Sequence, residues 1–392
     1  MKEKLGVLIT HPIQYFQPVF EELSKNSEIN TKVFFGCKAG LNEYYDEEFK
    51  KRISWNSSPT SGFESKFITD QVNIGGLRGI AGCWKGIQAA REIIKWDAHN
   101  VLIFAYTPTY ITAATVWLKV VGQKSLILRA DATDGAFKRN KLKKLARNIL
   151  LPAYYLLFDL VIPIGSESEE HYKRKGVPER KRKTALFSSN VYFFEDKIKA
   201  IKGKQPMPLG ENRRKQIISY MGKLSKRKGI LTLLEAIKNM TDDEIRKIKL
   251  LVVGSGELKI EIQNQLKEVK ELDYEMVGFI NQKEIVEYYA KSDTVVVPSI
   301  DGETWGLVVN EALQCGCRVI ATDKVGSSRD LLQAYPHEVI ASNDPSALRE
   351  AINRGFLKQR YWVDDPYRYK RIPKPSDLSD TVIQWLRKST SK

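Results

Sequence analysis

The most informative segment of this chain is Thr294-Val-Val-Val-Pro-Ser-Ile-Asp-Gly-Glu303-Thr-Trp-Gly306-Leu-Val-Val-Asn-Glu311-Ala-Leu-Gln-Cys-Gly-Cys317. Its first four residues form a short apolar run, typical of a strand buried on both faces of a parallel sheet. A polar loop follows, and an apolar helical pattern begins near Gly306. The segment therefore predicts a strand, a loop and a helix in succession, as in a parallel α/β sheet.

The same alternation of strands and helices runs outward from this segment in two series. The first series has strand candidates at residues 5–10, 32–35, 101–105, 125–128 and 160–164. The second has them at residues 217–221, 249–253, 274–277, 294–297 and 318–321, with helices such as 229–239 between them. A polar stretch containing Pro and Gly, residues 202–210, separates the two series and predicts an interdomain linker.

The chain has 392 residues, more than the roughly 250 to 300 at which single cores stop growing, so two domains are expected. The predicted fold class is α/β, with two Rossmann-like domains whose parallel sheets face a central cleft. We expect an N-terminal domain over residues 1–200 and a C-terminal domain over 201–375. Ligands of such sheets bind beyond the carboxyl ends of the strands, so the functional residues should lie in the strand-to-helix loops.

Composition and charge narrow the classes of partner. Apolar residues make up 42% of the chain and charged residues 28%, which excludes a disordered protein. The net charge is +16, and residues 138–183 hold 13 Lys and Arg against 5 Asp and Glu. Such an excess favours anionic partners, among them phosphates and acidic lipids. We expect residues 138–183 to dock on an anionic membrane; the alternative is a solvated basic helix packed on its sheet.

Two apolar stretches, residues 101–121 and 145–164, approach the length of a membrane span. Each contains a proline and a charged residue, so buried α/β elements are the simpler interpretation. The first residues show no signal-peptide pattern, which predicts a chain that stays in the cytoplasm. The four cysteines, spaced neither as a zinc site nor as a disulfide framework, are expected to be free thiols.

Two carboxylates of the central segment, Glu303 and Glu311, lie eight residues apart. Glu303 is expected in the loop, and Glu311 inside the helix, at about 1.5 Å of rise per residue. Between them, the unpaired N–H groups of Gly306, Leu307 and Val308 favour an anion. With a diphosphate bound there, Glu311 could accept hydrogen bonds from ribose hydroxyls, and Glu303 could contact the transferred sugar. The alternative is a first-turn Glu303 favoured by the helix dipole and a solvated Glu311.

This segment resembles the Glu-x7-Glu signature of the family 4 retaining glycosyltransferases, which have the GT-B fold of two Rossmann-like domains. The resemblance rests on Glu303, Glu311 and the residues that flank them, and it extends to residues 277–279 and 289–293. It spans residues 5–335, with the specific motifs between 221 and 326. In this family the last helix often crosses back to the N-terminal domain, so residues 376–392 are expected to do so here.

A second matching segment is Tyr220-Met-Gly222-Lys223-Leu-Ser-Lys-Arg-Lys228-Gly229. It resembles the family's loop whose paired basic residues hold the donor diphosphate, which gives that role to Lys223 and Lys228. The family more often has Arg at the first position, and an ammonium lacks the bidentate fork of a guanidinium. When the resemblance is set aside, the residues of this segment predict either an anion-binding loop or a solvated turn.

The resemblance implies roles for further residues. The donor-binding residues that it implies are Gly222, Lys223, Lys228, Gly254, Phe279, Glu303, Thr304, Gly306, Leu307, Val308 and Glu311. Glu303, Lys228 and Lys223 are the implied catalytic residues. The N-terminal half matches more weakly, and its expected acceptor-side residues are His11, Gln14 and Asp131, with Asp134 as an alternative to Asp131.

The family implies transfer of a sugar, with retention, from a nucleotide diphosphate-sugar to a glycan or lipid-linked acceptor. The nucleotide-sugar is then a co-substrate, no further cofactor is required, and no metal site is expected because no Asp-x-Asp motif follows a strand. A place in surface polysaccharide synthesis, on the inner face of the cell membrane, is consistent with this. Alternatives are a GT-B-like nucleotide-sugar epimerase or sugar phosphorylase, or a basic nucleic-acid-binding protein.

Overall fold

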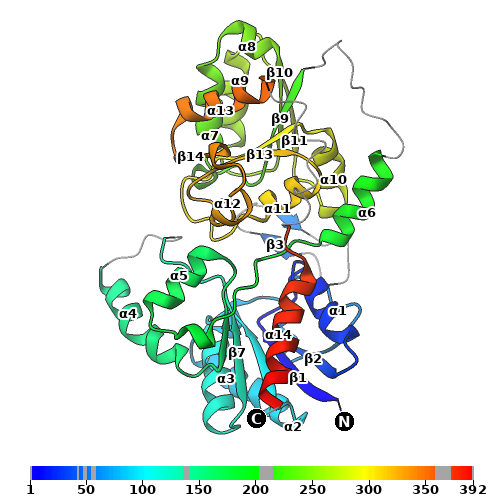
Figure 1. The fold of residues 1–392 in the computed structure, drawn as a ribbon, viewed down its shortest axis with the longest axis vertical. Helices are drawn as coiled ribbons and strands as arrows, with labels where there is room; N and C mark the ends of the chain where they lie inside the picture. Colours follow the sequence, from blue (N-terminus) through cyan, green and yellow to red (C-terminus); the bar gives the residue numbers. More distant parts are fainter. Residues whose placement is uncertain are drawn as a thin grey trace.

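The protein consists of two α/β units, one above the other in Figure 1, each built on a six-stranded parallel sheet. The computed structural model describes residues 2–41, 44–46, 51–53, 59–135, 141–202, 215–357 and 372–390. The predicted fold class is confirmed. Both sheets are covered by helices on their two faces, which is why their central strands are buried along most of their length.

The N-terminal sheet has the strand order β5-β2-β1-β6-β7-β8. Its strands are β1 (Glu3–Ile9), β2 (Ile29–Phe35), β5 (Glu64–Phe67), β6 (Asn100–Phe104), β7 (Ser125–Arg129) and β8 (Leu160–Ile162). The helices are α1 (Gln17–Lys25), α2 (Gly79–Lys95), α3 (Thr109–Val120), α4 (Lys141–Tyr155) and α5 (Ser166–Arg174), with short turns η1 (Gly75–Leu77) and η2 (Glu179–Lys181). A separate antiparallel pair joins β3 (Tyr44–Asp46) to β4 (Lys51–Ile53).

The C-terminal sheet repeats this topology with the order β11-β10-β9-β12-β13-β14. Its strands are β9 (Gln216–Met221), β10 (Ile248–Val253), β11 (Asp273–Gly278), β12 (Thr294–Val297), β13 (Arg318–Thr322) and β14 (Val339–Ile340). Its helices are α7 (Ile230–Lys238), α8 (Asp242–Arg246), α9 (Lys259–Glu268), α10 (Gln282–Lys291), α11 (Leu307–Gln314), α12 (Gly326–Leu331) and α13 (Pro345–Leu357), with turns η3 (Lys226–Lys228) and η4 (Pro336–Glu338). In both sheets the chain order reverses beside the first strand, between β1 and β6 and between β9 and β12.

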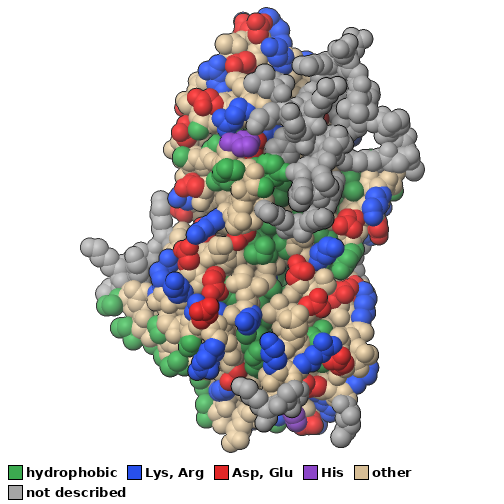
Figure 2. All heavy atoms as spheres, viewed as in Figure 1, with side chains coloured by type: hydrophobic (Ala, Val, Ile, Leu, Met, Phe, Trp, Pro, Cys, Tyr) green, Lys and Arg blue, Asp and Glu red, His purple; other side chains and the backbone are tan. Residues whose placement is uncertain are grey.

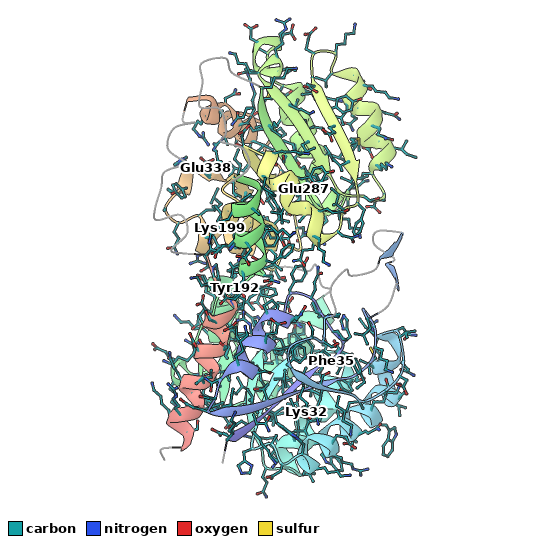
Figure 3. All side chains as sticks on the ribbon, turned by 90° about the vertical axis from the view of Figure 1, so that its right-hand side faces the viewer. Lys32, Phe35, Tyr192, Lys199, Glu287 and Glu338 are labelled. Atoms are coloured by element: carbon teal, nitrogen blue, oxygen red, sulfur yellow. The ribbon has the colours of Figure 1, made fainter. Side chains whose placement is uncertain are left out.

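Two helices join the units. The first, α6 (Val191–Lys202), carries Tyr192 and Lys199 and runs from the junction along the C-terminal unit, where it packs on α10 and α11 (Figure 3). The last helix, α14 (Pro375–Thr390), returns to pack on α1 of the N-terminal unit, where Arg387 pairs with Glu28. The expected linker at residues 202–210 lies outside the described residues, apart from the backbone of Lys202.

The two apolar stretches that approach membrane-span length are parts of this fold. Residues 101–121 form most of β6 and α3, and residues 145–164 form most of α4 and β8. Among the residues that the structure describes, no helix has the length and apolar character needed to cross a membrane. No disulfide joins any of the four cysteines, all of which lie in the described residues, and Cys37, Cys315 and Cys317 are buried.

Candidate active site

The loops after β9 and β12 meet at the reversal point of the C-terminal sheet. Because β9 and β12 are adjacent and parallel, their carboxyl ends open at the same edge. The backbone N–H of Ile300 donates to the carbonyl of Arg227 at 2.9 Å, and the Arg227 side chain donates to the carbonyl of Gly302 at 2.6 Å. Two loops about 75 residues apart in sequence are thus joined into one surface.

An ion pair between Lys228 and Glu303 bridges these two loops. The Lys228 Nζ contacts Glu303 Oε2, and the hydroxyl of Ser299 donates to the same oxygen at 3.1 Å. Both charged side chains are largely buried, at 23% and 13% exposed. The structure therefore brings together two of the three predicted catalytic residues at the mouth of α11.

Lys223 lies in the same loop as Lys228, next to the loop after β10. Its carbonyl accepts a hydrogen bond from the hydroxyl of Tyr220 at 2.6 Å. A Cβ at Gly254, which has φ 143°, would stand 1.7 Å from the carbonyl oxygen of Gly222, so only glycine allows this approach. The N–H of Gly254 donates to the carbonyl of Gly278 at 2.8 Å, which places Phe279, the next residue, beside the same loops.

Helix α11 begins where the sequence pattern predicts. Gly306 is its N-cap, with φ 91° in the left-handed region that favours glycine. Leu307 and Val308 form the first turn, so their N–H groups lack intrahelical partners and lie at the positive end of the helix dipole. Thr304 precedes the cap and is half-buried. An anion in front of this turn would also lie near Lys228 and Glu303.

Glu311 lies inside α11 and is only 6% exposed, so the alternative of a solvated helix position is wrong. Its Oε2 accepts a hydrogen bond from the hydroxyl of Tyr289 at 2.9 Å. Burial raises the pKa of Glu311 to about 7, although the bond from Tyr289 partly opposes that rise. A carboxyl that is near half ionised at neutral pH, with one oxygen still open to a further partner, suits a hydroxyl-rich ligand.

The corresponding loops of the N-terminal unit surround a cavity of about 170 Å³. It lies at the carboxyl ends of β1, β6 and β7, at the reversal point of that sheet. Its lining residues are Ile9, Thr10, Ile13, Phe16, Phe104, Ala105, Arg129, Ala130, Asp131, Ile164 and Phe187. The rings of Phe16 and Phe187 stack with centroids 5.5 Å apart. This cavity is mostly apolar, unlike the loops around Lys228.

Arg129 is the buried cation of this cavity, at 2% exposed. Its Nη1 donates to the carbonyls of Pro163 at 2.7 Å and Ala185 at 2.6 Å, while burial lowers the pKa of Arg129 to about 9. The guanidinium thus holds the backbone around the cavity in place. It also lies 5.8 Å from the centroid of the Phe187 ring.

The predicted acceptor-side residues are distributed unevenly around this cavity. Asp131 lines it, whereas His11 lies beside it and shares a 2.8 Å hydrogen bond with Thr10. Burial lowers the pKa of His11 to about 4, so its imidazole is neutral at neutral pH. Gln14 is buried, at 7% exposed. Of the two predicted aspartates, Asp131 is therefore the one that faces the cavity.

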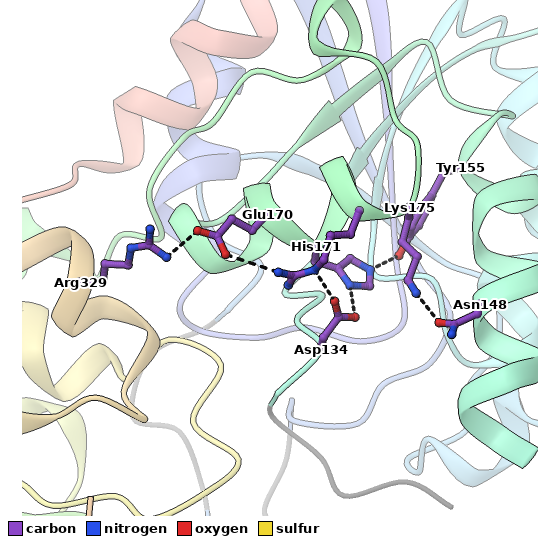
Figure 4. Close-up of polar contacts among 8 residues, drawn as sticks. Asp134, Asn148, Tyr155, Glu170, His171, Lys175 and Arg329 are labelled. Atoms are coloured by element: carbon purple, nitrogen blue, oxygen red, sulfur yellow. Dashed lines mark hydrogen bonds and ion pairs between the residues drawn. The ribbon is translucent and has the colours of Figure 1, made fainter. Parts of the chain in front are cut away.

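Asp134 belongs to a polar network farther along the same loop (Figure 4). It accepts from His171 Nδ1 at 2.7 Å and from Arg174 Nε at 3.0 Å. Burial raises the pKa of Asp134, but the two hydrogen bonds outweigh burial and the net pKa is below the usual range. The second ring nitrogen of His171, Nε2, shares a 3.0 Å hydrogen bond with the hydroxyl of Tyr155 on α4. Asp134 thus ties α4 and α5 to the loop.

Direct contacts hold the two units against each other beside these loops. The Ser166 N–H and hydroxyl donate to the carboxylate of Asp330 on α12, and Arg329 pairs with Glu170 at 2.6 Å. On α11, the Asn310 amide donates to the carbonyl of Phe187 at 2.9 Å. Phe187 lines the N-terminal cavity, so this bond connects that cavity to the helix that carries Glu311.

The sequence model of the family described as "Glycosyl transferases group 1" matches residues 202–368. This match covers the loops after β9 and β12 and the whole of α11. Residues 202–368 of the chain are therefore similar to the group 1 glycosyltransferases. Within the described residues, no three His, Cys, Asp or Glu side chains are grouped so as to hold a metal ion.

Curated relatives of the chain are matched over part of their length. One is the "Putative teichuronic acid biosynthesis glycosyltransferase TuaC" of Bacillus subtilis, 29% identical over 48% of this chain and 42% of the relative. Another is the "N-acetylgalactosamine-N,N'-diacetylbacillosaminyl-diphospho-undecaprenol 4-alpha-N-acetylgalactosaminyltransferase" of Campylobacter jejuni, 26% identical over 58% and 59%. The chain therefore spans about half of the length of the curated relatives that it matches.

Among solved structures, the fold is similar to that of Anabaena HepE in complex with UDP. The TM-score is 0.68, with 14% identity over 99% of this chain and 100% of that chain. At this identity the likeness concerns the fold, and it covers both units of the chain with the two-unit GT-B architecture.

Several residues of the site escape sequence reasoning. Tyr289 precedes its partner Glu311 by 22 residues, and Phe187 reaches the cavity from the segment before α6. Ser299, which donates to Glu303, lies within the central segment. The helical spacing of Tyr289 on α10 shows only that it is a core position, because its hydrogen-bond partner comes from another helix.

Proposed function

We propose that this chain is a retaining glycosyltransferase that moves a sugar from a nucleotide diphosphate-sugar to a glycan or lipid-linked acceptor. The observation that carries the proposal is the Lys228–Glu303 ion pair at the reversal point of the C-terminal sheet, directly before the N-terminus of α11. A cation, a carboxylate and unpaired helix N–H groups converge there. This combination suits a diphosphate with a sugar attached.

Within this proposal each residue has one role. Lys223, Lys228 and the N–H groups of the first turn of α11 bind the diphosphate, and Glu311 accepts a hydrogen bond from ribose. Gly222, Gly254 and Phe279 shape the pocket for the nucleotide, while Thr304 and Glu303 meet the transferred sugar. The ammonium of Lys228 has three N–H donors, so it can contact a phosphate oxygen while it holds Glu303.

In the proposed reaction, the bond from the anomeric carbon to the phosphate oxygen breaks, and its electron pair leaves with the diphosphate. The acceptor hydroxyl forms the new bond on the same face of the sugar, and its proton passes to the leaving phosphate. The two lysines and the helix N-terminus stabilise the negative charge that develops on the leaving oxygen. No metal and no further cofactor take part in this scheme.

The N-terminal cavity is the proposed acceptor site. In this proposal Asp131 accepts a hydrogen bond from an acceptor hydroxyl, the neutral imidazole of His11 lies at the edge of the cavity, and the buried Gln14 belongs to the same loop as His11. The apolar lining suits the faces of sugar rings or the start of a lipid. The Campylobacter relative acts on a diphospho-undecaprenol-linked glycan by its name, which supports a lipid-linked acceptor here.

The same comparisons support a proposal for the donor base and for the cellular location. The complex of HepE with UDP makes uridine the first base to test. The TuaC relative, named for teichuronic acid biosynthesis, supports a role in surface polysaccharide synthesis. We place the chain in the cytoplasm, peripheral on the inner face of the cell membrane, with the basic residues 138–183 toward the lipid.

The other candidate functions have less support. An epimerase or a sugar phosphorylase shares the architecture, but the relatives are named as glycosyltransferases. Nucleic-acid binding would rest on the net charge of +16 alone. The Lys228–Glu303 pair before the first turn of α11 favours neither of them over glycosyl transfer.

Product analysis tests the proposal. The purified chain is incubated with UDP-sugars and lipid-linked oligosaccharide, with each component also omitted in turn. We expect a product that requires both components and keeps the anomeric configuration of the donor, read by NMR. An inverted product would contradict retention, and an altered nucleotide-sugar formed without acceptor would indicate an epimerase.

A further inference from the structure

Exposed apolar side chains concentrate on one face of the N-terminal unit. Nine of the twelve large hydrophobic side chains exposed in the described part of the chain belong to α2, α3, α4 or the residues just after them. They are Ile80, Trp84, Val116, Val120, Val121, Leu145, Ile149, Leu150 and Leu156. In Figure 2 hydrophobic side chains follow the margin of the lower unit where Figure 1 places α4 and α3. A grouping of this kind marks an interaction surface.

Helix α4 has the composition of a helix that lies at a lipid interface. Its inner face is buried through Leu151 and Tyr155, while Ile149 and Leu150 are 65% and 66% exposed. Its sequence, KLKKLARNILLPAYY, contains four Lys or Arg and no Asp or Glu. Apolar side chains beside cations on one helix bind an anionic lipid surface by burial and by charge together.

A pocket of about 390 Å³ opens beside the end of α4. Its walls are apolar, and the cations Lys175, Arg180 and Lys181 line it, with no acidic side chain among its described lining residues. The Lys175 ammonium donates to Asn148 of α4 at 2.5 Å, and the Lys181 ammonium to the carbonyl of Phe158 at 2.7 Å. Three cations next to apolar walls match the chemistry of a lipid phosphate with its adjoining chain.

The contacts beneath this face hold its helices in place. A Cβ at Gly86 of α2 would stand 2.2 Å from the carbonyl oxygen of Tyr110, so α2 and α3 pack with their backbones in contact. The Tyr154 hydroxyl of α4 donates to Thr115 of α3 at 3.0 Å, and Tyr155 contacts His171 of α5 (Figure 4). The three helices therefore form one connected platform.

We propose that the α2–α4 face docks on an anionic phospholipid bilayer, and that the pocket lined by Lys175, Arg180 and Lys181 receives a lipid phosphate. The exposed side chains of α4 and α3 enter the headgroup layer, and the cations beside them meet the negative surface. The inference deepens the proposed membrane location by naming its contact surface. It does not depend on the donor site, because docking needs no nucleotide-sugar.

Vesicle sedimentation of the full chain tests the apolar part of this surface. The vesicles contain phosphatidylcholine alone, or phosphatidylcholine and phosphatidylglycerol in equal amounts. We expect binding to the mixed vesicles that salt weakens, and little binding to phosphatidylcholine alone. The double variant Ile149→Ser, Leu150→Ser should bind about tenfold or more weakly. Ile260→Ser is the matched control, because Ile260 on α9 is 72% exposed but lies in the other unit.

The pocket is tested separately with Arg180→Glu against Lys267→Glu, an exposed position on α9. We expect Arg180→Glu to lower binding to the mixed vesicles about tenfold and Lys267→Glu to leave it nearly unchanged. Thermal melting confirms that all variants fold, and UDP binding reports the donor site independently.

Equal binding by wild type and both sets of variants would overturn the proposal, as would equal binding to the two kinds of vesicle. Light scattering provides a further check on what covers the apolar face. A dimer that the Ile149→Ser, Leu150→Ser change dissociates, with no lipid binding by wild type, would assign the face to a second copy of the chain instead.

Discussion

The two units share one sheet topology but present opposite chemistry at the same topological position. At the reversal point between β9 and β12, the loops offer Lys228, Glu303 and the first turn of α11. Between β1 and β6 the loops surround an apolar cavity, and its buried cation, Arg129, already donates hydrogen bonds to backbone carbonyls. The comparison shows that the sheet supplies the position of a ligand, while the loop residues supply its chemistry.

This difference suits the two substrates of the proposed transfer reaction. A nucleotide diphosphate is an anion and needs cations and N–H donors, whereas sugar rings and lipids need apolar contacts and a few hydrogen bonds. Changes in the C-terminal loops should therefore affect charge stabilisation and nucleotide affinity. Changes in the N-terminal cavity should affect the acceptor alone.

The largest expected effect is that of Lys228→Ala. We propose that the Lys228 ammonium stabilises the leaving diphosphate, so its loss should lower kcat about 10²- to 10³-fold, as loss of a charge-stabilising donor does in other enzymes. Steady-state kinetics with saturating acceptor measures it. Lys238→Ala, which removes a lysine paired with Glu268 on the same unit, is the control and should change kcat by less than about twofold. A similar kcat for both variants would contradict the role of Lys228.

Glu311→Gln should weaken nucleotide diphosphate binding with little effect on the N-terminal cavity. Replacing an acceptor of a ribose hydrogen bond costs about 2 kcal/mol where that acceptor is charged, or about a 30-fold rise in Kd. Calorimetric titration with UDP checks this value. An unchanged Kd would mean that Glu311 serves only the hydrogen bond with Tyr289.

The same variant should change how stability depends on pH. Because burial raises the pKa of Glu311 to about 7 in the folded state, its stabilising contribution is complete below the ordinary pKa and is lost as pH rises through about 7. Gln, which is neutral at every pH, does not lose that contribution. Relative to wild type, Glu311→Gln should therefore gain stability between about pH 5 and pH 8. Thermal unfolding of wild type and variant at both pH values measures this difference. If the stability of the two proteins changes with pH in parallel, the pKa of Glu311 is ordinary.

The smallest expected effect concerns the acceptor cavity. Phe16→Leu keeps the apolar lining but removes the ring that stacks on Phe187. We expect the acceptor KM to rise about three- to tenfold, with the Kd of the nucleotide unchanged. If nucleotide affinity changed instead, the assignment of the donor to one unit and the acceptor to the other would be contradicted.

The sequence predicts the fold well where strands are buried on both faces. The predicted run at residues 294–297 coincides with β12, and residues 217–221 differ from β9 by one residue. β5 and β14 at the sheet edges were missed. The strand β5 has the polar sequence ESKF and alternates between exposed and half-buried residues, so it lacks a continuous apolar run.

The site is only partly predictable. The spacing of Glu303 and Glu311 and the loop containing Lys228 suggest a donor site, but their contact depends on β9 lying next to β12, which is a long-range pairing. The burial of Glu311 also depends on Tyr289 from another helix. The apolar cavity gathers side chains from the ends of β1, β6 and β7, from the loop before α1, and from residues 164 and 187, and no local pattern links them.

Nucleotide binding to the purified chain tests the central claim most directly. Thermal unfolding is measured with UDP, GDP, ADP and CMP, for wild type and for Glu311→Ala. A ligand that binds only the folded chain raises its melting temperature by mass action. We expect a rise with one nucleoside diphosphate, UDP first, and loss of that rise in the variant. No rise with any of the four would contradict a donor site at the reversal point of the C-terminal sheet.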